Sequence, residues 1–315
     1  MIDLHTTVPR FSSILVIGGS GFIGRHLIAQ LAATGRRVIV PTRRANRSRM
    51  FSVLPTVEVV QADIHDDAVL ARLVAKVDAV INLVGILHST RGKSGSSYGP
   101  EFAAAHVALP KKIVAACRAA GVERLLHVSA LGASATGPSM YLRSKADGEA
   151  AVLTSGLDVT VFKPSVVFGP EDKFLNMFAS LQSIFPLMPL GGAQARFQPV
   201  YVGDLVQAMI NTLENPATYG HAYEVTGPTV YTLRTLVELA GKWSGHRRPV
   251  VPLSSTLAGI QAFVLEHLPG EPLMSRDNLD SMQVDNVASA PAAAILGIRQ
   301  TSLESVAPLY LNRQP

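Results

Sequence analysis

Cysteine and charged residues are scarce in this sequence of 315 residues. A single cysteine, Cys117, excludes a disulfide framework within the chain and favours a reducing compartment. Only 16% of the residues are charged, against about a quarter in ordinary soluble domains. Disorder requires low hydrophobicity and high net charge, whereas 48% of these residues are hydrophobic and the net charge is +5. The sequence therefore predicts a globular protein with a large core, in one large or two unequal domains.

A membrane-spanning run, a zinc-type cluster and a nucleic-acid module are also missing. The longest uncharged stretch, 174–195, contains two prolines and a glycine pair, which break any continuous spanning helix. The nine histidines are scattered singly, so no metal site is predicted. No basic and aromatic module accompanies the positive charge, and no nucleic acid is expected as a partner. Because no secretory signal opens the sequence, we expect a cytoplasmic location.

Short apolar, β-branched runs alternate with helix-like segments through the first half of the chain. This alternation predicts an α/β fold of the Rossmann type, a doubly wound parallel sheet with helices on both faces. The predicted strands are 14–17, 38–40, 57–60, 79–84, 125–128 and 159–162, and the predicted helices are 25–33, 67–76, 103–119 and 145–153.

After Gly169 the periodicity changes, which predicts a smaller, mixed α/β lobe at the carboxyl-terminal end. We assign residues 1–168 to the dinucleotide-binding domain and expect 200–227 to pack back onto it. Residues 169–199 and 228–315 then form the smaller lobe for a substrate or for docking. A polar insert rich in glycine and serine, 88–100, follows the fourth strand, and we expect it to be a mobile loop over the site.

A glycine loop between the first strand and the first helix carries the cofactor signal. It reads GGSGFIG over 18–24, with Gly18, Gly21 and Gly24 three residues apart. Such glycines allow a tight turn and close backbone approach, and the following helix offers free N–H groups to a pyrophosphate. The glycine spacing alone is weak evidence for a dinucleotide site, but its position between a strand and a helix makes the evidence strong. The predicted cofactor contacts here are Gly18, Ser20, Gly21, Phe22, Ile23 and Gly24.

The end of the second strand distinguishes the two dinucleotides. An acidic residue there normally holds the ribose of NAD(H), whereas a 2′-phosphate requires cations. This strand ends in Arg43 and Arg44, with Arg47 and Arg49 following and no acid among them. Guanidinium groups match phosphate oxygens, so NADP(H) is preferred and NAD(H) is the second choice. A solvated basic loop is the alternative interpretation, and it suits Arg47 and Arg49 better.

The next two strands end in further candidates for cofactor contact. Asp63 and Ile64 follow the third strand, where an acid and an apolar residue suit an adenine, although Asp63 also suits a helix cap. Asn82 and Gly85 lie at the end of the fourth strand.

Ser129, Tyr141 and Lys145 form the candidate catalytic group. Tyr141 and Lys145 are one helical turn apart, and Ser129 follows the preceding strand. A phenol is a poor base near neutral pH unless a cation favours the phenolate. We therefore expect Lys145 to lower the pKa of Tyr141, while Ser129 holds the substrate oxygen during hydride exchange with a nicotinamide.

With these motifs the chain resembles the extended or atypical short-chain dehydrogenase/reductase superfamily over nearly its full length. It is most similar to bacterial relatives of the nucleotide-binding accessory subunit of respiratory complex I. The segments that carry the resemblance are GGSGFIG (18–24), HVSALG (127–132), YLRSK (141–145), KPSVVFGP (163–170), RFQPVYVGDLVQAM (196–209) and RDNLDSMQVDN (276–286).

The resemblance implies cofactor contacts from Pro164 and Ser165, and it implies that 200–204 joins the two lobes. It also implies that the nucleotide is structural in the mitochondrial relatives. His106 stands near the position where many extended members carry an asparagine, which puts the proton relay in doubt. For Arg196 we expect either an anion contact or an ion pair with Asp204 or Glu171.

Two functions follow. The first is an NADP(H)-dependent oxidoreductase acting on an apolar carbonyl or alcohol, or an epimerase or dehydratase that uses the same residues. The alternative is a non-catalytic NADPH-binding accessory or assembly protein, docked on a respiratory complex at the inner face of the membrane. Two apolar segments, 174–190 and 255–268, are expected to line a substrate pocket, complete the core or form the docking surface.

Overall fold

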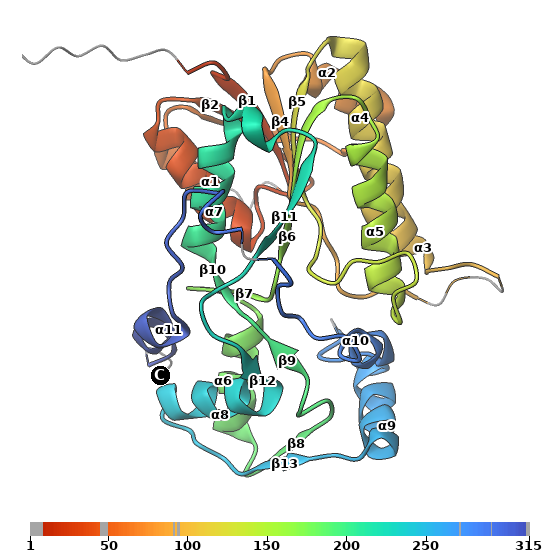
Figure 1. The fold of residues 1–315 in the computed structure, drawn as a ribbon, viewed down its shortest axis with the longest axis vertical. Helices are drawn as coiled ribbons and strands as arrows, with labels where there is room; N and C mark the ends of the chain where they lie inside the picture. Colours follow the sequence, from red (N-terminus) through yellow and green to blue (C-terminus); the bar gives the residue numbers. More distant parts are fainter. Residues whose placement is uncertain are drawn as a thin grey trace, which may run out of the picture.

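A seven-stranded parallel sheet forms the larger part of the molecule in the computed structural model, which describes residues 9–44, 50–90, 92, 95–270, 272–290 and 292–312 (Figure 1). The spatial order of its strands is β11-β6-β5-β4-β1-β2-β3, and every neighbouring pair is parallel. The strands are β1 (Ser13–Ile17), β2 (Arg37–Thr42), β3 (Val57–Gln61), β4 (Ala79–Asn82), β5 (Arg124–Val128), β6 (Asp158–Pro164) and β11 (His221–Val225). The predicted Rossmann-type α/β fold is confirmed.

Both faces of this sheet are buried, because successive side chains of each strand enter opposite cores. In β1, Ile14 and Val16 face one core, whereas Leu15 and Ile17 face the other. The first core is covered by α1 (Phe22–Ala33) and α7 (Val202–Leu213), and the second by α2 (Asp67–Val74), α4 (Leu109–Ala120) and α5 (Met140–Leu153). Helix α5 begins five residues before the predicted start, so Tyr141 lies in its first turn.

A π-helical segment, Ala103–Ala108, joins the short helix α3 (Pro100–Phe102) to α4. The periodicity predicts an ordinary helix here. The wider turn brings the carbonyl of His106 against α5, where a Cβ added to Gly148 would lie 1.9 Å from that oxygen. Extra residues of this kind often occur at functional sites.

The smaller carboxyl-terminal lobe, also confirmed, has its own core between α6 (Phe174–Ile184), α8 (Leu233–Trp243) and α11 (Leu303–Leu311). Three two-stranded sheets complete it: β7 (Val167–Phe168) with β10 (Val200–Tyr201), β9 (Arg196–Phe197) with β12 (Tyr231–Thr232), and β8 (Met188–Leu190) with β13 (Val250–Pro252). Helices α9 (Ser255–Glu266) and α10 (Arg276–Ser281) form a separate arm at one side (Figure 1). A 3₁₀ turn, Pro216–Thr218, precedes β11, the strand that returns the chain to the large sheet. The residue boundaries between the two parts stay a prediction.

The two apolar segments have different surroundings. In α6, Leu175 and Phe178 are buried in the core of the smaller lobe. In α9 only Ala258 and Ala262 are buried, and Ile260 is 57% exposed. No helix among the described residues is long and apolar enough to cross a membrane.

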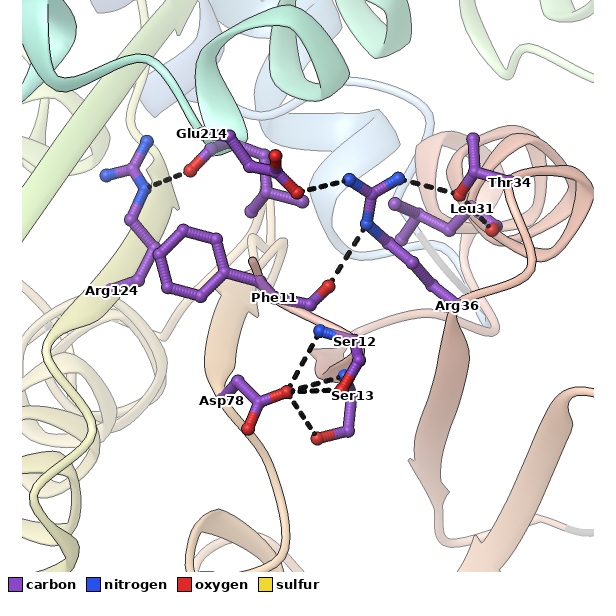
Figure 2. A network of polar contacts seen from close by, with 10 residues as sticks. Phe11, Ser12, Ser13, Leu31, Thr34, Arg36, Asp78, Arg124 and Glu214 are labelled. Carbon is purple, nitrogen blue, oxygen red and sulfur yellow. Dashed lines mark hydrogen bonds and ion pairs between the residues drawn. The ribbon is translucent and has the colours of Figure 1, made fainter. Parts of the chain in front are cut away.

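Polar contacts fasten the edge of the sheet where its strands begin (Figure 2). The guanidinium of Arg36 donates to the carboxylate of Glu214 at 2.6 Å, which ties the start of β2 to the end of α7. The Asp78 carboxylate accepts from the backbone amides and hydroxyls of Ser12 and Ser13. This edge is opposite the strand ends that carry the candidate site.

Arg124 is fully buried at the same edge. Its guanidinium donates to the carbonyls of Thr212 and Leu213, the last residues of α7, and it lies 4.2 Å from the Tyr219 ring. Carbonyls at the end of a helix lack N–H donors within the helix. The Arg124 guanidinium supplies the missing donors. Burial lowers the pKa of this guanidinium to about 10.

Gly148 and Gly259 provide a matched pair of helical glycines. We expect Gly148→Ala to lower the free energy of unfolding by about 1–3 kcal/mol, because its methyl group would overlap the His106 carbonyl. Nothing lies within 4 Å of a Cβ at Gly259, so Gly259→Ala is expected to be neutral or stabilising by up to about 1 kcal/mol. Urea unfolding measures both, and equal effects would contradict the tight contact at Gly148.

Candidate functional site

The glycine loop forms a narrow cradle between β1 and α1. Gly18 has a left-handed φ of +82°, and a Cβ there would lie 3.2 Å from the backbone of Leu83 in the segment after β4. A Cβ at Gly24 would lie 2.4 Å from the Gly19 carbonyl, so α1 starts directly against the loop. Gly21 is the N-cap and has no side chain to occupy the first amides of the helix. The N–H groups of Gly19 and Gly21 donate to nearby backbone carbonyls, whereas the first amides of α1 have no partner within the helix and suit a phosphate.

The other loop residues line this cradle. Ser20, Phe22 and Ile23 are half-buried around it. The Phe22 ring also reaches the second lobe, since a Cβ at Gly169 would lie 3.5 Å from its tip. The predicted contacts from residues 18–24 thus lie together at one place.

Arg43 and Arg44 follow β2 at the same edge of the sheet, and both are exposed. Only the backbone of Arg44 is fixed, through the Thr42 hydroxyl. Within the part of the chain that the structure describes, neither guanidinium forms an ion pair. Arg47 and Arg49 lie outside the described residues. Two unpaired guanidinium groups beside the cradle suit an added phosphate.

Asp63 is exposed after β3, and its Oδ1 accepts from the His65 amide at 3.0 Å. The cap of α2 is Asp66, whose carboxylate accepts from the Val69 amide at 3.0 Å. The alternative of Asp63 as the helix cap is therefore wrong, and its carboxylate stays at the sheet edge. The neighbouring Ile64 is half-buried.

Asn82 is buried at the end of β4 and holds two segments in place. Its Oδ1 accepts from the Val84 amide at 3.1 Å, and its Nδ2 lies 3.1 Å from Nδ1 of His127. Asn82 thus shapes the turn after β4. That turn passes close to Lys145, since a Cβ at Gly85 would lie 3.3 Å from its Nζ.

Two of the three candidate catalytic residues, Lys145 and Ser129, are hydrogen-bonded to other groups of the protein. Lys145 is buried, and its Nζ donates to the Val128 carbonyl at 3.1 Å. The hydroxyl of Ser129 donates to Glu149 at 2.7 Å, and Glu149 also lies 3.3 Å from the Lys163 ammonium.

Burial decides the ionisation of the pair on α5. It lowers the pKa of Lys145 to about 8, partly offset by the Glu149 carboxylate. It raises the pKa of Tyr141 to about 12. The expected lowering of the Tyr141 pKa by Lys145 is absent in this geometry, because burial causes the shift and disfavours the phenolate.

The His106 ring packs against the Tyr141 ring. Its Nε2 accepts from the Ile86 amide at 3.1 Å, so Nδ1 carries the proton and donates to the Ser144 hydroxyl at 2.8 Å. Burial, with the Lys145 charge, lowers the His106 pKa to about 2. The imidazole stacks on Phe102 at 5.2 Å and meets the Tyr141 ring edge-on at 5.6 Å. Both nitrogens are occupied, so this neutral ring is poorly suited to relay protons.

Pro164 and Ser165 lie where β6 leaves the sheet. The Ser165 hydroxyl donates to Oδ1 of Asn286 at 2.5 Å, and the same oxygen accepts from the Val166 amide at 3.2 Å. Asn286 is a site-shaping residue that the sequence did not single out by itself, although it ends the segment RDNLDSMQVDN.

Asp277, in the same segment, was also missed. Its carboxylate accepts from the amides of Met140 at 2.6 Å and Tyr141 at 3.1 Å, the start of the helix that carries the candidate catalytic pair. The sequence separation of 136 residues for the Tyr141 contact hides such an interaction from any local pattern.

Two contacts between distant segments differ from expectation. Arg196 pairs with Asp285 at 3.3 Å, so the predicted ion pair with Asp204 or Glu171 is wrong. Glu171 pairs instead with Arg25, in the first turn of α1.

The insert at 88–100, predicted to be mobile, is attached to α5, because Tyr98 donates to Asp147 at 2.9 Å.

Together, the fold and the glycine cradle define a dinucleotide-binding protein. The chain belongs to the NAD dependent epimerase/dehydratase family, which it matches over residues 14–226.

Two curated relatives share the name NADH dehydrogenase (ubiquinone) 1 alpha subcomplex subunit 9, mitochondrial. The Arabidopsis thaliana protein is 32% identical over 288 residues, with 87% of this chain and 70% of that protein covered. The Rattus norvegicus protein is 32% identical over 297 residues, with 92% and 77% covered. The solved dTDP-glucose 4,6-dehydratase of Streptomyces venezuelae, which holds NAD, has a TM-score of 0.73 at 22% identity and 95% coverage of both chains.

The low pKa of Lys145 predicts a pH dependence of stability. Its folded value of about 8 lies below its ordinary value of 10.5, so the unfolded chain binds more protons between these values and stability rises with pH. From pH 7 to 9.5, the free energy of unfolding of the protein should rise by about 2 kcal/mol relative to Lys145→Met. Urea titrations across this range measure the difference, and a constant difference would contradict the buried ammonium.

Proposed function

We propose that this protein is a nucleotide-binding accessory or assembly protein of a respiratory membrane complex, and that it prefers NADP(H). The observation that carries the proposal is the exposed apolar face of α9, where Leu257, Ile260, Phe263 and Val264 are 49–57% exposed. A face of this kind normally marks an interaction site. The two relatives named as subunits of NADH dehydrogenase (ubiquinone) support it.

The side chains at the site suit retention of a nucleotide better than its turnover. The cradle at 18–24 would hold the pyrophosphate, Arg43 and Arg44 the 2′-phosphate, Asp63 and Ile64 the adenine end, and Pro164 and Ser165 the nicotinamide end. The nicotinamide supplies a hydride when bound. Burial keeps the proton on the Tyr141 oxygen. Turnover would need that proton to be replaced after each transfer, yet both nitrogens of the nearby His106 are already hydrogen-bonded.

An oxidoreductase or epimerase acting on an apolar substrate is the second candidate. Ser129, Tyr141 and Lys145 favour it, because all three lie at the carboxyl edge of the sheet, where this fold places its ligands. In this function Tyr141 exchanges the proton, Lys145 holds the ribose and Ser129 orients the substrate oxygen. Single-turnover oxidation of bound NADPH by a carbonyl panel, lost in Tyr141→Phe, would establish this candidate in place of the first.

The cofactor preference has a direct test. Removing both cations in Arg43→Ala/Arg44→Ala should weaken NADPH binding by about tenfold or more and leave NADH binding nearly unchanged, because only the 2′-phosphate loses its partners. Arg37→Ala is the matched control, since Arg37 lies at the other end of β2 and pairs with Glu58. Calorimetric titration measures the affinities, and equal affinities for both nucleotides in the unaltered protein would refute the phosphate argument.

The docking surface is tested in native cells. The protein should co-fractionate with membranes and respiratory components, and Ile260→Asp should shift at least half of it to the supernatant, because a charge in the docked face must be desolvated. Val53→Asp is the control, since Val53 is 79% exposed but lies on the large domain. A protein that stays in the supernatant without any substitution would overturn the proposed function.

A further inference from the structure

The smaller lobe carries further exposed apolar side chains besides those of α9. Helix α6, the strand pair β8–β13 and α9 all reach the end farthest from the large sheet, the bottom of the view in Figure 1. We call the exposed apolar side chains at these elements the apolar tip. They are 45–71% exposed: Ile184, Phe185, Leu187, Val251, Leu257, Ile260, Phe263, Val264 and Leu268.

Cations border the apolar tip. The segment that leads from α8 into β13, 242–248, contains Lys242, Arg247 and Arg248 and no acidic residue. Lys242 and Arg247 are exposed, whereas Arg248 donates to the Gln182 carbonyl at 3.0 Å. Large apolar side chains beside a basic margin match the interface of an anionic bilayer, where the apolar groups enter the headgroup region and the cations meet lipid phosphates.

The arm formed by α9 and α10 is held mainly by polar contacts. Helix α10 has no buried residue. Arg276 at its start donates to Glu266 of α9 at 3.1 Å and lies 5.1 Å from the Phe263 ring. Gln261 attaches α9 to β8 by donating to the Pro189 carbonyl at 2.8 Å. Such an element, with few buried apolar contacts, belongs to the least stable parts of a fold.

This arm nevertheless forms hydrogen bonds with the start of α5. Asp277 of α10 accepts from the amides of Met140 and Tyr141, and Ser281 donates to the hydroxyl of Ser139, the N-cap residue, at 2.8 Å. A carboxylate is favourable at this positive helix end. The position of Tyr141 therefore depends on an arm whose outer face belongs to the apolar tip.

We propose that contact of the apolar tip with an anionic bilayer and nucleotide binding beside Tyr141 are coupled through α10, with Asp277 as the positioning residue. The inference rests on the proposed function, because it assumes a bound nucleotide and a docked tip. A bilayer that orders α9 also orders α10 and so stabilises the start of α5 in the geometry that the nucleotide contacts. Coupling of this kind is reciprocal, so the nucleotide strengthens membrane binding by the same factor.

The test measures NADPH affinity by its fluorescence in the full-length protein, with and without vesicles. Vesicles of phosphatidylglycerol and phosphatidylcholine should tighten NADPH binding by about fivefold or more, and phosphatidylcholine alone should not. Sedimentation should show that saturating NADPH tightens binding to the anionic vesicles by the same factor. Asp277→Asn should remove most of this coupling but keep vesicle binding, and Asp277→Glu should restore part of it.

Asp280→Asn is the matched control, because Asp280 lies on the same helix and its carboxylate accepts from the Gln283 side chain at 3.1 Å instead of from the start of α5. It should leave the coupling intact. If NADPH and anionic vesicles both bind but neither changes the affinity of the other, or if Asp277→Asn keeps the full coupling, the inference is overturned while the proposed function stands. Absence of vesicle binding overturns the inference too, whereas co-fractionation in cells judges the proposed function separately.

Discussion

The start of α5 is capped by a carboxylate from a distant part of the chain, and the geometry of the candidate site depends on this contact. Asp277 accepts from the first amides of the helix. From there α5 places Tyr141 against His106, Lys145 against the end of β5 and Glu149 against Ser129. The smaller lobe therefore helps to build the site.

The second feature of this site is that several of its polar groups are hydrogen-bonded to other groups of the protein. Ser129 donates to a carboxylate, Lys145 to a carbonyl, and both nitrogens of His106 are engaged. Buried polar networks of this kind fix a shape when every member has a partner. The engaged groups are poorly placed to exchange protons with a substrate, which supports the proposed retention of a nucleotide.

Much of the large domain could be predicted from the sequence, because strands buried on both faces and glycine-terminated helices leave local patterns. The loop at 18–24 and the consecutive Arg43 and Arg44 are likewise local features. The π-helical turn at His106 was not predicted, since it depends on packing against Gly148. Asp277 and Asn286 were missed because their partners lie more than a hundred residues away. The periodicity of α9 could not show whether its apolar face is buried, because core helices and docking helices share that pattern.

Arg43 and Arg44 beside the glycine cradle suit a phosphate, whereas the apolar tip suits a membrane surface. The two lie at separate places in the fold. Together they fit the proposed function, in which the protein brings NADP(H) to a membrane complex and retains it. The most direct measurement is the nucleotide released on denaturing the protein purified from its native membranes, identified and counted by chromatography. We expect close to one NADP(H) per chain, unchanged after incubation with carbonyl substrates. NAD(H) alone, or oxidation of the nucleotide during that incubation, would contradict it.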